Sequence, residues 1–285
     1  MTKKSQDRRQ FLQLAGAGAV VSLTGARSSL GQNRRSSGRR PRKPQFQLGL
    51  ASYTLRKFDL DQTLAMTRRL DLKYICFKDF HLALDSTPAQ IEAVVAKVKE
   101  AGLTLYGGGV IGMKNEDQVH QAFDYAKAAG MKVIVASPAP QMLPMIDEKV
   151  RQYDIKVAIH NHGPGDKHFP TPSAIYKQVK DLDKRIGICH DIGHTKRFGA
   201  DPLAETEKYA DRLHDMHIKD VSAANENGKG VEIGRGVIDI PKFIRILVKI
   251  KYDGIVSFEY EKDADDPMAG LAESVGYIRG VMAAV

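Results

Sequence analysis

Residues 156–191 read KVAIHNHGPGDKHFPTPSAIYKQVKDLDKRIGICHD, and this stretch contains a strand, a helix and a second strand in that order. The apolar runs at 156–161 and 186–191 are rich in Val, Ile and Ala without strict alternation, which is typical of parallel strands covered on both faces. Between them, residues 172–182 have a helical apolar period and a proline in the first turn. The stretch therefore predicts a βαβ unit.

The same alternation occurs eight times from residue 45 onward. Strand-like runs occupy residues 46–52, 74–77, 103–108, 132–137, 156–161, 186–191, 213–219 and 254–260. Helical segments follow them at residues 60–70, 88–102, 116–130, 141–153, 172–182, 202–212, 241–250 and 270–284. Eight such units in about 240 residues predict an α/β fold, a single (β/α)8 TIM barrel over residues 45–285. A doubly wound parallel sheet is the alternative.

The basic charge of the chain lies in its first 44 residues. The formal charge of the whole chain is +9, but residues 1–44 hold eleven Lys and Arg against one acidic residue. The remaining residues carry 32 basic and 33 acidic side chains. The predicted barrel carries almost no net charge, so its electrostatics do not favour binding to nucleic acid.

The first residues also have the pattern of an export signal. Arg8 and Arg9 precede a weakly apolar, Ala/Gly-rich run that ends in small residues, which is typical of a twin-arginine signal. We expect a signal peptide at 1–26, cleaved near Ala26, and a disordered basic linker at 27–44. The protein is then periplasmic or otherwise exported, without membrane integration after cleavage. An ordinary amphipathic N-terminal helix is the alternative.

Polar residues follow the strand-like runs, where a barrel of this kind has its active site. Residues two apart on a strand share a face, so the polar pairs at the last two strands are expected to point into the barrel. This gathering of polar residues at one end of the strands predicts one functional site at the mouth formed by the C-terminal ends of the strands. Its polar residues are Lys78, His81, His160, His162, Asp191, His194, His217, Lys219, Glu259 and Glu261.

Three of these residues form a candidate metal centre. Asp191, His217 and Glu259 end three consecutive strands and are expected to converge at one mouth. Carboxylates and imidazoles with open positions suit a divalent ion such as Mn²⁺, Mg²⁺, Co²⁺ or Zn²⁺. We therefore expect one divalent metal ion as the cofactor, with a metal-free polar pocket as the alternative.

Four motifs resemble a known family. CHDIGH at 189–194, MHIKD at 216–220, EIGRGVIDIP at 232–241 and YDGIVSFEYE at 252–261 occur in the order seen in the xylose isomerase-like TIM barrels. That family includes sugar isomerases, ketose 3-epimerases, inosose dehydratases and apurinic-site endonucleases, and the resemblance covers nearly all of residues 45–285. It implies that Asp191, His217 and Glu259 bind the metal. It also implies that Arg235, in the loop before the seventh helix, faces the substrate.

The fifth strand departs from the family pattern. Many relatives have a glutamate in LENH at its end, whereas this chain reads IHNHG and has His160 at that position. His162, two residues further on, shares its face. Either histidine is a candidate for the fourth metal ligand, and either is a candidate base. The chain therefore departs from an epimerase mechanism that uses two opposed glutamates.

The resemblance and the residue types imply the same chemistry. A metal that chelates adjacent carbonyl and hydroxyl oxygens of a sugar stabilises the enediolate formed when the neighbouring C–H bond loses its proton. His160, His162 or His194 is expected to take that proton. Lys78 and Lys219 are candidates for protonating a departing oxygen or holding the enediolate oxygen. Candidates for substrate contacts are His81, His168, His194 and Arg235.

These features predict a divalent-metal-dependent sugar isomerase or epimerase that works through an enediolate. A metal-dependent lyase or dehydratase that acts on keto-sugars or 3-keto-glycosides is the alternative, and export favours it somewhat. An apurinic-site-type nuclease and a non-catalytic sugar-binding protein are less expected. The partner is a small-molecule sugar, and a homo-oligomer is left open.

Overall fold

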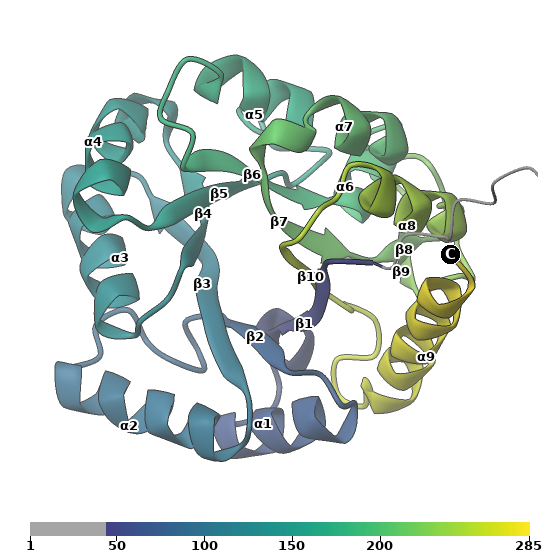
Figure 1. Ribbon diagram of the computed structural model, residues 1–285, viewed down its shortest axis with the longest axis horizontal. Helices are drawn as coiled ribbons and strands as arrows, with labels where there is room; N and C mark the ends of the chain where they lie inside the picture. Colours follow the sequence, from purple (N-terminus) through teal and green to yellow (C-terminus); the bar gives the residue numbers. More distant parts are fainter. Residues whose placement is uncertain (1–43) are drawn as a thin grey trace, which may run out of the picture. The chain divides into compact units, whose positions relative to one another are not determined.

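The computed structural model describes residues 44–285. Eight parallel strands close into a barrel in the order β1-β10-β7-β6-β5-β4-β3-β2, and helices surround it (Figure 1). The predicted TIM barrel is therefore confirmed, and the doubly wound sheet is wrong because the sheet has no open edge. The predicted signal peptide, and all of the predicted linker except Pro44, lie outside the described residues.

The observed strands agree closely with the apolar runs of the sequence. The barrel strands are β1 (Gln47–Ala51), β2 (Tyr74–Phe77), β3 (Thr104–Met113), β4 (Val133–Pro138), β5 (Lys156–His160), β6 (Ile186–Asp191), β7 (Leu213–Ile218) and β10 (Ile255–Phe258). A separate antiparallel pair, β8 (Asp220–Val221) and β9 (Gly230–Val231), follows β7.

Helices occupy the connections, as the helical periods predict. They are α1 (Leu60–Arg69), α2 (Pro88–Glu100), α3 (Glu116–Ala128), α4 (Leu143–Tyr153), α5 (Pro172–Val179), α6 (Ile192–Arg197), α7 (Pro202–Lys208), α8 (Ile240–Lys249) and α9 (Met268–Ala284). Short 3-10 turns are η1 (Ser52–Leu55), η2 (Pro140–Met142) and η3 (Ala210–Arg212). Within residues 44–285, no helix has the length and apolar character needed to cross a membrane.

Side-chain caps define where many of these helices begin. The side chains of Asp59 and Thr87 each accept a hydrogen bond from the backbone N–H three residues on, and the side-chain oxygen of the glutamine there accepts one from the backbone N–H of the cap residue. These two capping boxes satisfy amides that the first turn leaves without partners. Single caps of the same kind start other helices at Asn115, Thr171, Asp191, Asp201 and Asp239.

The barrel interior below the mouth is packed rather than open. Cys76, Tyr106, Val133, Val135, Ala158 and Cys189 form a buried cluster there, and both cysteines are free thiols. Strands β3 and β4 approach each other closely at this level. A Cβ on Gly107 would lie 2.8 Å from the carbonyl oxygen of Val133, so only glycine fits that position. The packed interior supports the polar residues at the mouth from below.

Candidate metal centre at the barrel mouth

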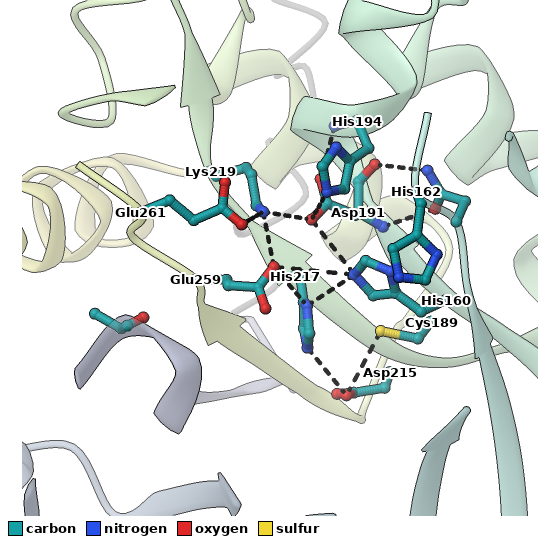
Figure 2. A network of polar contacts seen from close by, with 12 residues as sticks. His160, His162, Cys189, Asp191, His194, Asp215, His217, Lys219, Glu259 and Glu261 are labelled. Carbon is teal, nitrogen blue, oxygen red and sulfur yellow. Dashed lines mark hydrogen bonds and ion pairs between the residues drawn. The ribbon is translucent and has the colours of Figure 1, made fainter. Parts of the chain in front are cut away.

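Four side chains of metal-ligating types meet at the C-terminal ends of four adjacent strands. His160 ends β5, Asp191 ends β6, His217 lies in β7 and Glu259 follows β10 (Figure 2). One potential ligand atom from each lies within 4.8 Å of all the others, and all four residues are buried. The structure thus brings His160 together with the three residues that the sequence nominated as metal ligands.

The distances within this group suit a shared cation. His160 Nε2 lies 3.1 Å from His217 Nδ1 and 3.5 Å from Asp191 Oδ2. Glu259 Oε2 lies 3.1 Å from His217 Nδ1 and 3.9 Å from His160 Nε2. Ligands bound at about 2.0–2.2 Å to one tetrahedral ion are themselves roughly 3.3–3.6 Å apart. Two imidazole nitrogens and two carboxylate oxygens therefore form a donor set that fits one divalent ion.

A buried ammonium group lies against the same carboxylates. Lys219 Nζ is 2.8 Å from Asp191 Oδ2, 2.7 Å from Glu259 Oε2 and 3.2 Å from Glu261 Oε1. Burial opposes the charge on Lys219, but these carboxylates outweigh it and raise its pKa well above its ordinary value. The sequence prediction that Lys219 points into the barrel is consistent with this placement, and its ammonium balances part of the negative charge.

The two carboxylates of the candidate metal site are held in their charged form. Burial opposes ionisation of Asp191, but His194 and Lys219 outweigh it and hold the pKa of its carboxyl well below the usual range. Lys219 is the partner that stays charged at neutral pH, since burial lowers the pKa of His194. Burial likewise opposes ionisation of Glu259, and His217 and Lys219 lower the pKa of its carboxyl. Both oxygens are therefore available to a cation.

The two histidines of the candidate metal site differ in charge. Burial lowers the pKa of His160 to about 3, so this imidazole is neutral at neutral pH. Burial also opposes the charge on His217, but the nearby Glu259 carboxylate outweighs it and raises the pKa of His217 to about 9. His217 must therefore release a proton before it can bind a metal at neutral pH.

A cavity of about 240 Å³ lies beside the candidate metal site. The candidate residues Lys78, His162 and His194 line it together with His160 and Glu259. The three imidazoles are close neighbours: the ring centroid of His160 lies 4.6 Å from that of His162 and 5.8 Å from that of His194. The cavity wall also includes Tyr53, Val110 and Glu261.

Tyr53 is a cavity residue that the sequence reasoning missed. It lies in η1, directly after β1, and its side chain borders the cavity. Its position could have indicated this role, because Tyr53 directly follows a strand whose C-terminal end forms part of the barrel mouth.

Three predicted substrate contacts do not reach the cavity. His81 is buried against α1, where its Nε2 lies 2.9 Å from Thr63 Oγ1 and 3.0 Å from the carbonyl oxygen of Phe58. Arg235 lies on the surface and pairs with Glu273. His168 is exposed on the loop before α5. None of the three residues lines the cavity, because their side chains lie against other partners or in solvent.

Asp220 explains why two of the sequence motifs occur together. Its buried carboxylate accepts hydrogen bonds from the amides of Gly234 at 3.0 Å, Gly236 at 2.9 Å and Ile238 at 3.2 Å. A Cβ on Gly236 would lie 2.1 Å from Asp220 Oδ1. Asp220, the last residue of the MHIKD motif, thus fixes the backbone of the loop that contains Gly234 and Gly236.

Comparison with known proteins agrees with this architecture. The family model described as "Xylose isomerase-like TIM barrel" matches residues 64–281. Among curated proteins, the rhizopine catabolism protein MocC of Rhizobium meliloti is 27% identical over 131 residues, which is 41% of this chain and 40% of that protein. Inosose dehydratase of Lacticaseibacillus casei is 26% identical over 138 residues, 42% of this chain and 45% of that protein. The chain thus spans less than half the length of these relatives.

Solved structures share the fold over most of the chain. The IolI protein with a bound zinc atom has a TM-score of 0.71 at 15% identity, covering 84% of this chain and 99% of that one. An L-ribulose 3-epimerase has a TM-score of 0.67 at 16% identity, with 84% and 95% coverage. The 3-keto-D-glucoside 4-epimerase of E. coli has a TM-score of 0.64 at 17% identity, with 84% and 100% coverage. At these identities the likeness concerns the fold.

Proposed function

The chain belongs to the xylose isomerase-like TIM barrel family, and we propose that it is a divalent-metal-dependent sugar isomerase or epimerase. The observation that carries the proposal is the convergence of His160, Asp191, His217 and Glu259 beside a cavity lined by two further histidines. Relatives and structural neighbours that modify sugars support an enzyme of this class.

The four converging side chains would hold the metal ion. Bound there, a divalent cation would polarise the carbonyl and hydroxyl oxygens of a sugar and stabilise the negative charge left by proton loss. The chain itself supplies the rest of the electrostatics. Lys219 stays protonated against Asp191 and Glu259 and limits the negative charge that the substrate meets.

The cavity provides candidate bases outside the ligand set. His162 and His194 both border it, and burial lowers the pKa of His194, which keeps that ring neutral at neutral pH. A neutral imidazole can take a proton from a carbon next to the carbonyl. Return of the proton to the neighbouring carbon gives an isomer, and return to the opposite face gives an epimer. We propose that two histidines, in place of two glutamates, carry out these proton transfers.

The cavity suits an unphosphorylated sugar. Its volume of about 240 Å³ is below the range of drug-sized ligand pockets, so the ligand is small. Among the residues that line it, Lys78 is the one cation, and its Nζ lies 3.0 Å from the carboxylate of Asp79. A phosphate group would find no arginine or cluster of lysines there. Neutral hydroxyl and carbonyl groups match the lining better.

A lyase or dehydratase is the second candidate. Several curated relatives are inosose dehydratases, although each match covers less than half of either chain. Such a reaction shares the proton abstraction and then expels an oxygen from the neighbouring carbon, which needs an acid. Lys78 borders the cavity and is the candidate for protonating that oxygen, with Lys219 as the deeper alternative.

We also propose that the protein is exported by the twin-arginine route. The arginine pair at residues 8 and 9 and the apolar run that follows support this proposal. A reporter fused to residues 1–44 should reach the periplasm of a host with the twin-arginine translocase and should stay inside when both arginines are replaced by lysine. Export of the lysine variant at the wild-type level would contradict the proposal.

Metal analysis and proton exchange test the main proposal. The purified protein should hold about one divalent ion per chain and should exchange substrate protons for deuterium on some member of a panel of keto-sugars and inososes. Asp191→Ala should lose both properties. Asp201→Ala, which removes a carboxylate that caps α7 outside the cavity, should keep both.

Three outcomes separate the candidates. Full exchange by Asp191→Ala, or no bound ion in the wild-type protein, would refute the metal mechanism. Formation of a new ketose or aldose would select the isomerase or epimerase. Release of water from an inosose, or of an aglycone from a 3-keto-glucoside, would select the lyase.

A further inference from the structure

We propose that Asp166 is a positioning residue that orients His162 and selects which of its ring nitrogens faces the cavity. The proposal rests on the proposed function, because it identifies His162 as the group that takes the substrate proton. It adds a residue that neither the sequence motifs nor the four-ligand cluster point to. The pair lies on the loop between β5 and α5.

The contact between the two side chains is direct. His162 Nδ1 lies 3.3 Å from Asp166 Oδ2, four residues further along the chain. The other carboxylate oxygen, Oδ1, accepts hydrogen bonds from the backbone amides of His168 at 2.8 Å and Phe169 at 2.9 Å. Two backbone amides therefore fix the orientation of the carboxylate, and its free oxygen is presented to the imidazole.

The loop that carries this pair is anchored at several points. The amide of His162 donates to the carbonyl oxygen of Phe169 at 3.2 Å, and the Phe169 ring is buried. The amide of Asp166 donates to the carbonyl oxygen of Gly163 at 3.3 Å. Gly163 has a φ of +72°, and a Cβ there would lie 2.6 Å from the backbone oxygen of His194. The loop thus packs directly against the backbone of α6.

A carboxylate at Nδ1 has a defined effect on a histidine. It stabilises the tautomer with the proton on Nδ1 and leaves the lone pair of Nε2 for the substrate. When the substrate C–H bond breaks, its electron pair stays on the sugar and its proton moves to His162 Nε2.

The second cavity histidine lacks such a partner. The buried Nδ1 of His194 has no hydrogen-bond partner among the described residues, and its Nε2 lies 3.9 Å from the ligand oxygen Asp191 Oδ2. Its ring is therefore oriented toward the metal centre and has no carboxylate behind it. The contrast favours His162 over His194 as the base.

Asp166→Asn is the decisive variant. The asparagine oxygen can still accept the amides of His168 and Phe169, so the loop keeps its caps, whereas the side-chain NH₂ now faces His162 Nδ1. We expect ¹⁵N NMR of histidine-labelled protein to show the Nδ1-protonated tautomer of His162 in the wild type and the Nε2-protonated one in the variant. Deuterium exchange should fall by about 10²-fold or more in kcat, with little change in KM.

Matched variants separate positioning from loop structure. Asp201→Asn changes another capping carboxylate that contacts no imidazole, and it should leave the His162 tautomer and kcat unchanged. Asp166→Glu, which keeps the charge, should retain the wild-type tautomer and recover part of kcat. His162→Gln should match Asp166→Asn in kcat or be slower.

The tautomer measurement needs no substrate, so the two proposals can fail separately. Absence of exchange on every sugar would refute the proposed function, and the NMR result alone would then decide the orientation. The same His162 tautomer in wild type and Asp166→Asn, or exchange at the wild-type rate in that variant, would overturn the role assigned to Asp166.

Discussion

At the residue scale, His160 is the position where the candidate metal site departs from the family pattern of a glutamate at the end of the fifth strand. An imidazole there makes the donor set two nitrogens and two oxygens. Imidazole suits Zn²⁺ and Co²⁺, whereas carboxylate oxygens suit Mg²⁺ and Mn²⁺. His160 is neutral at physiological pH, so it can bind a metal ion without first releasing a proton.

We therefore expect His160→Glu to shift metal preference toward Mn²⁺ and Mg²⁺. Competition binding followed by metal analysis measures the ratio directly, and a change of about tenfold or more in the Zn²⁺ to Mn²⁺ ratio is expected. His120→Glu, on the exposed face of α3, is the control and should leave the ratio unchanged. An unchanged ratio in His160→Glu would exclude His160 as a ligand.

His217 links metal binding to pH. Its pKa of about 9 means that the metal-free site carries a proton there at neutral pH. Metal binding needs the neutral imidazole, so affinity should rise with pH up to about 9, by close to tenfold per unit. Calorimetry in buffers of different ionisation enthalpy should show release of about one proton per ion at pH 7. Affinity that is independent of pH between 6 and 9 would contradict the assignment.

His190 makes a separate contribution to stability. It faces the helices, where its ring nitrogens lie 2.9 Å from Thr195 Oγ1 and 3.0 Å from Thr206 Oγ1, and burial lowers its pKa to about 3. In the unfolded chain His190 binds its proton near pH 6.5, so its contribution to stability is fully present above that pH. It is lost progressively as the pH falls toward 3.

Lowering the pH from 7 to 5 should therefore remove about 2 kcal/mol of stability through His190 alone. In His190→Gln this part of the loss should be absent, although the variant is less stable at both pH values. Urea unfolding at the two pH values measures the difference. An equal loss in both proteins would show that His190 is not the titrating group.

At the element scale, strand β3 depends on a close approach that only glycine permits. Gly107 lies against Val133 of β4, whereas nothing lies within 4 Å of a Cβ on Gly112 in the same strand. Gly107→Ala should therefore lower the free energy of unfolding by about 1–3 kcal/mol. Gly112→Ala should change it by much less, and urea unfolding of both variants checks this. Equal effects would mean that strand propensity, not packing, sets the value.

The short helix α6 is an element that the sequence pattern did not predict. It begins because Asp191 Oδ1 accepts a hydrogen bond from the amide of His194 at 2.7 Å. One carboxylate thus starts the helix through Oδ1, and its Oδ2 faces Lys219 and His160 of the candidate metal site. Six residues are too few for a recognisable apolar period, so only the cap reveals this helix. The pair β8 and β9 escaped prediction for the same reason of length.

At the scale of the whole molecule, the closed barrel and its functional end could be predicted from the sequence. Strand-like runs and helical periods alternate eight times, and the polar residues stand after the strands. Asp191, His217 and Glu259 lie at or next to the ends of the strands that the apolar runs predict. Apolar periodicity depends only on residues close together along the chain, so it can be recognised from the sequence alone.

Only the tertiary structure decided which partner each polar side chain meets. His81 is bound by α1, Arg235 by Glu273 and Lys219 by carboxylates more than 25 positions away in the sequence. Asp166 lies near His162 in sequence, yet only the folded loop turns its carboxylate toward the ring. A strand end specifies that a group lies at the mouth, whereas its contacts depend on packing between elements distant along the chain.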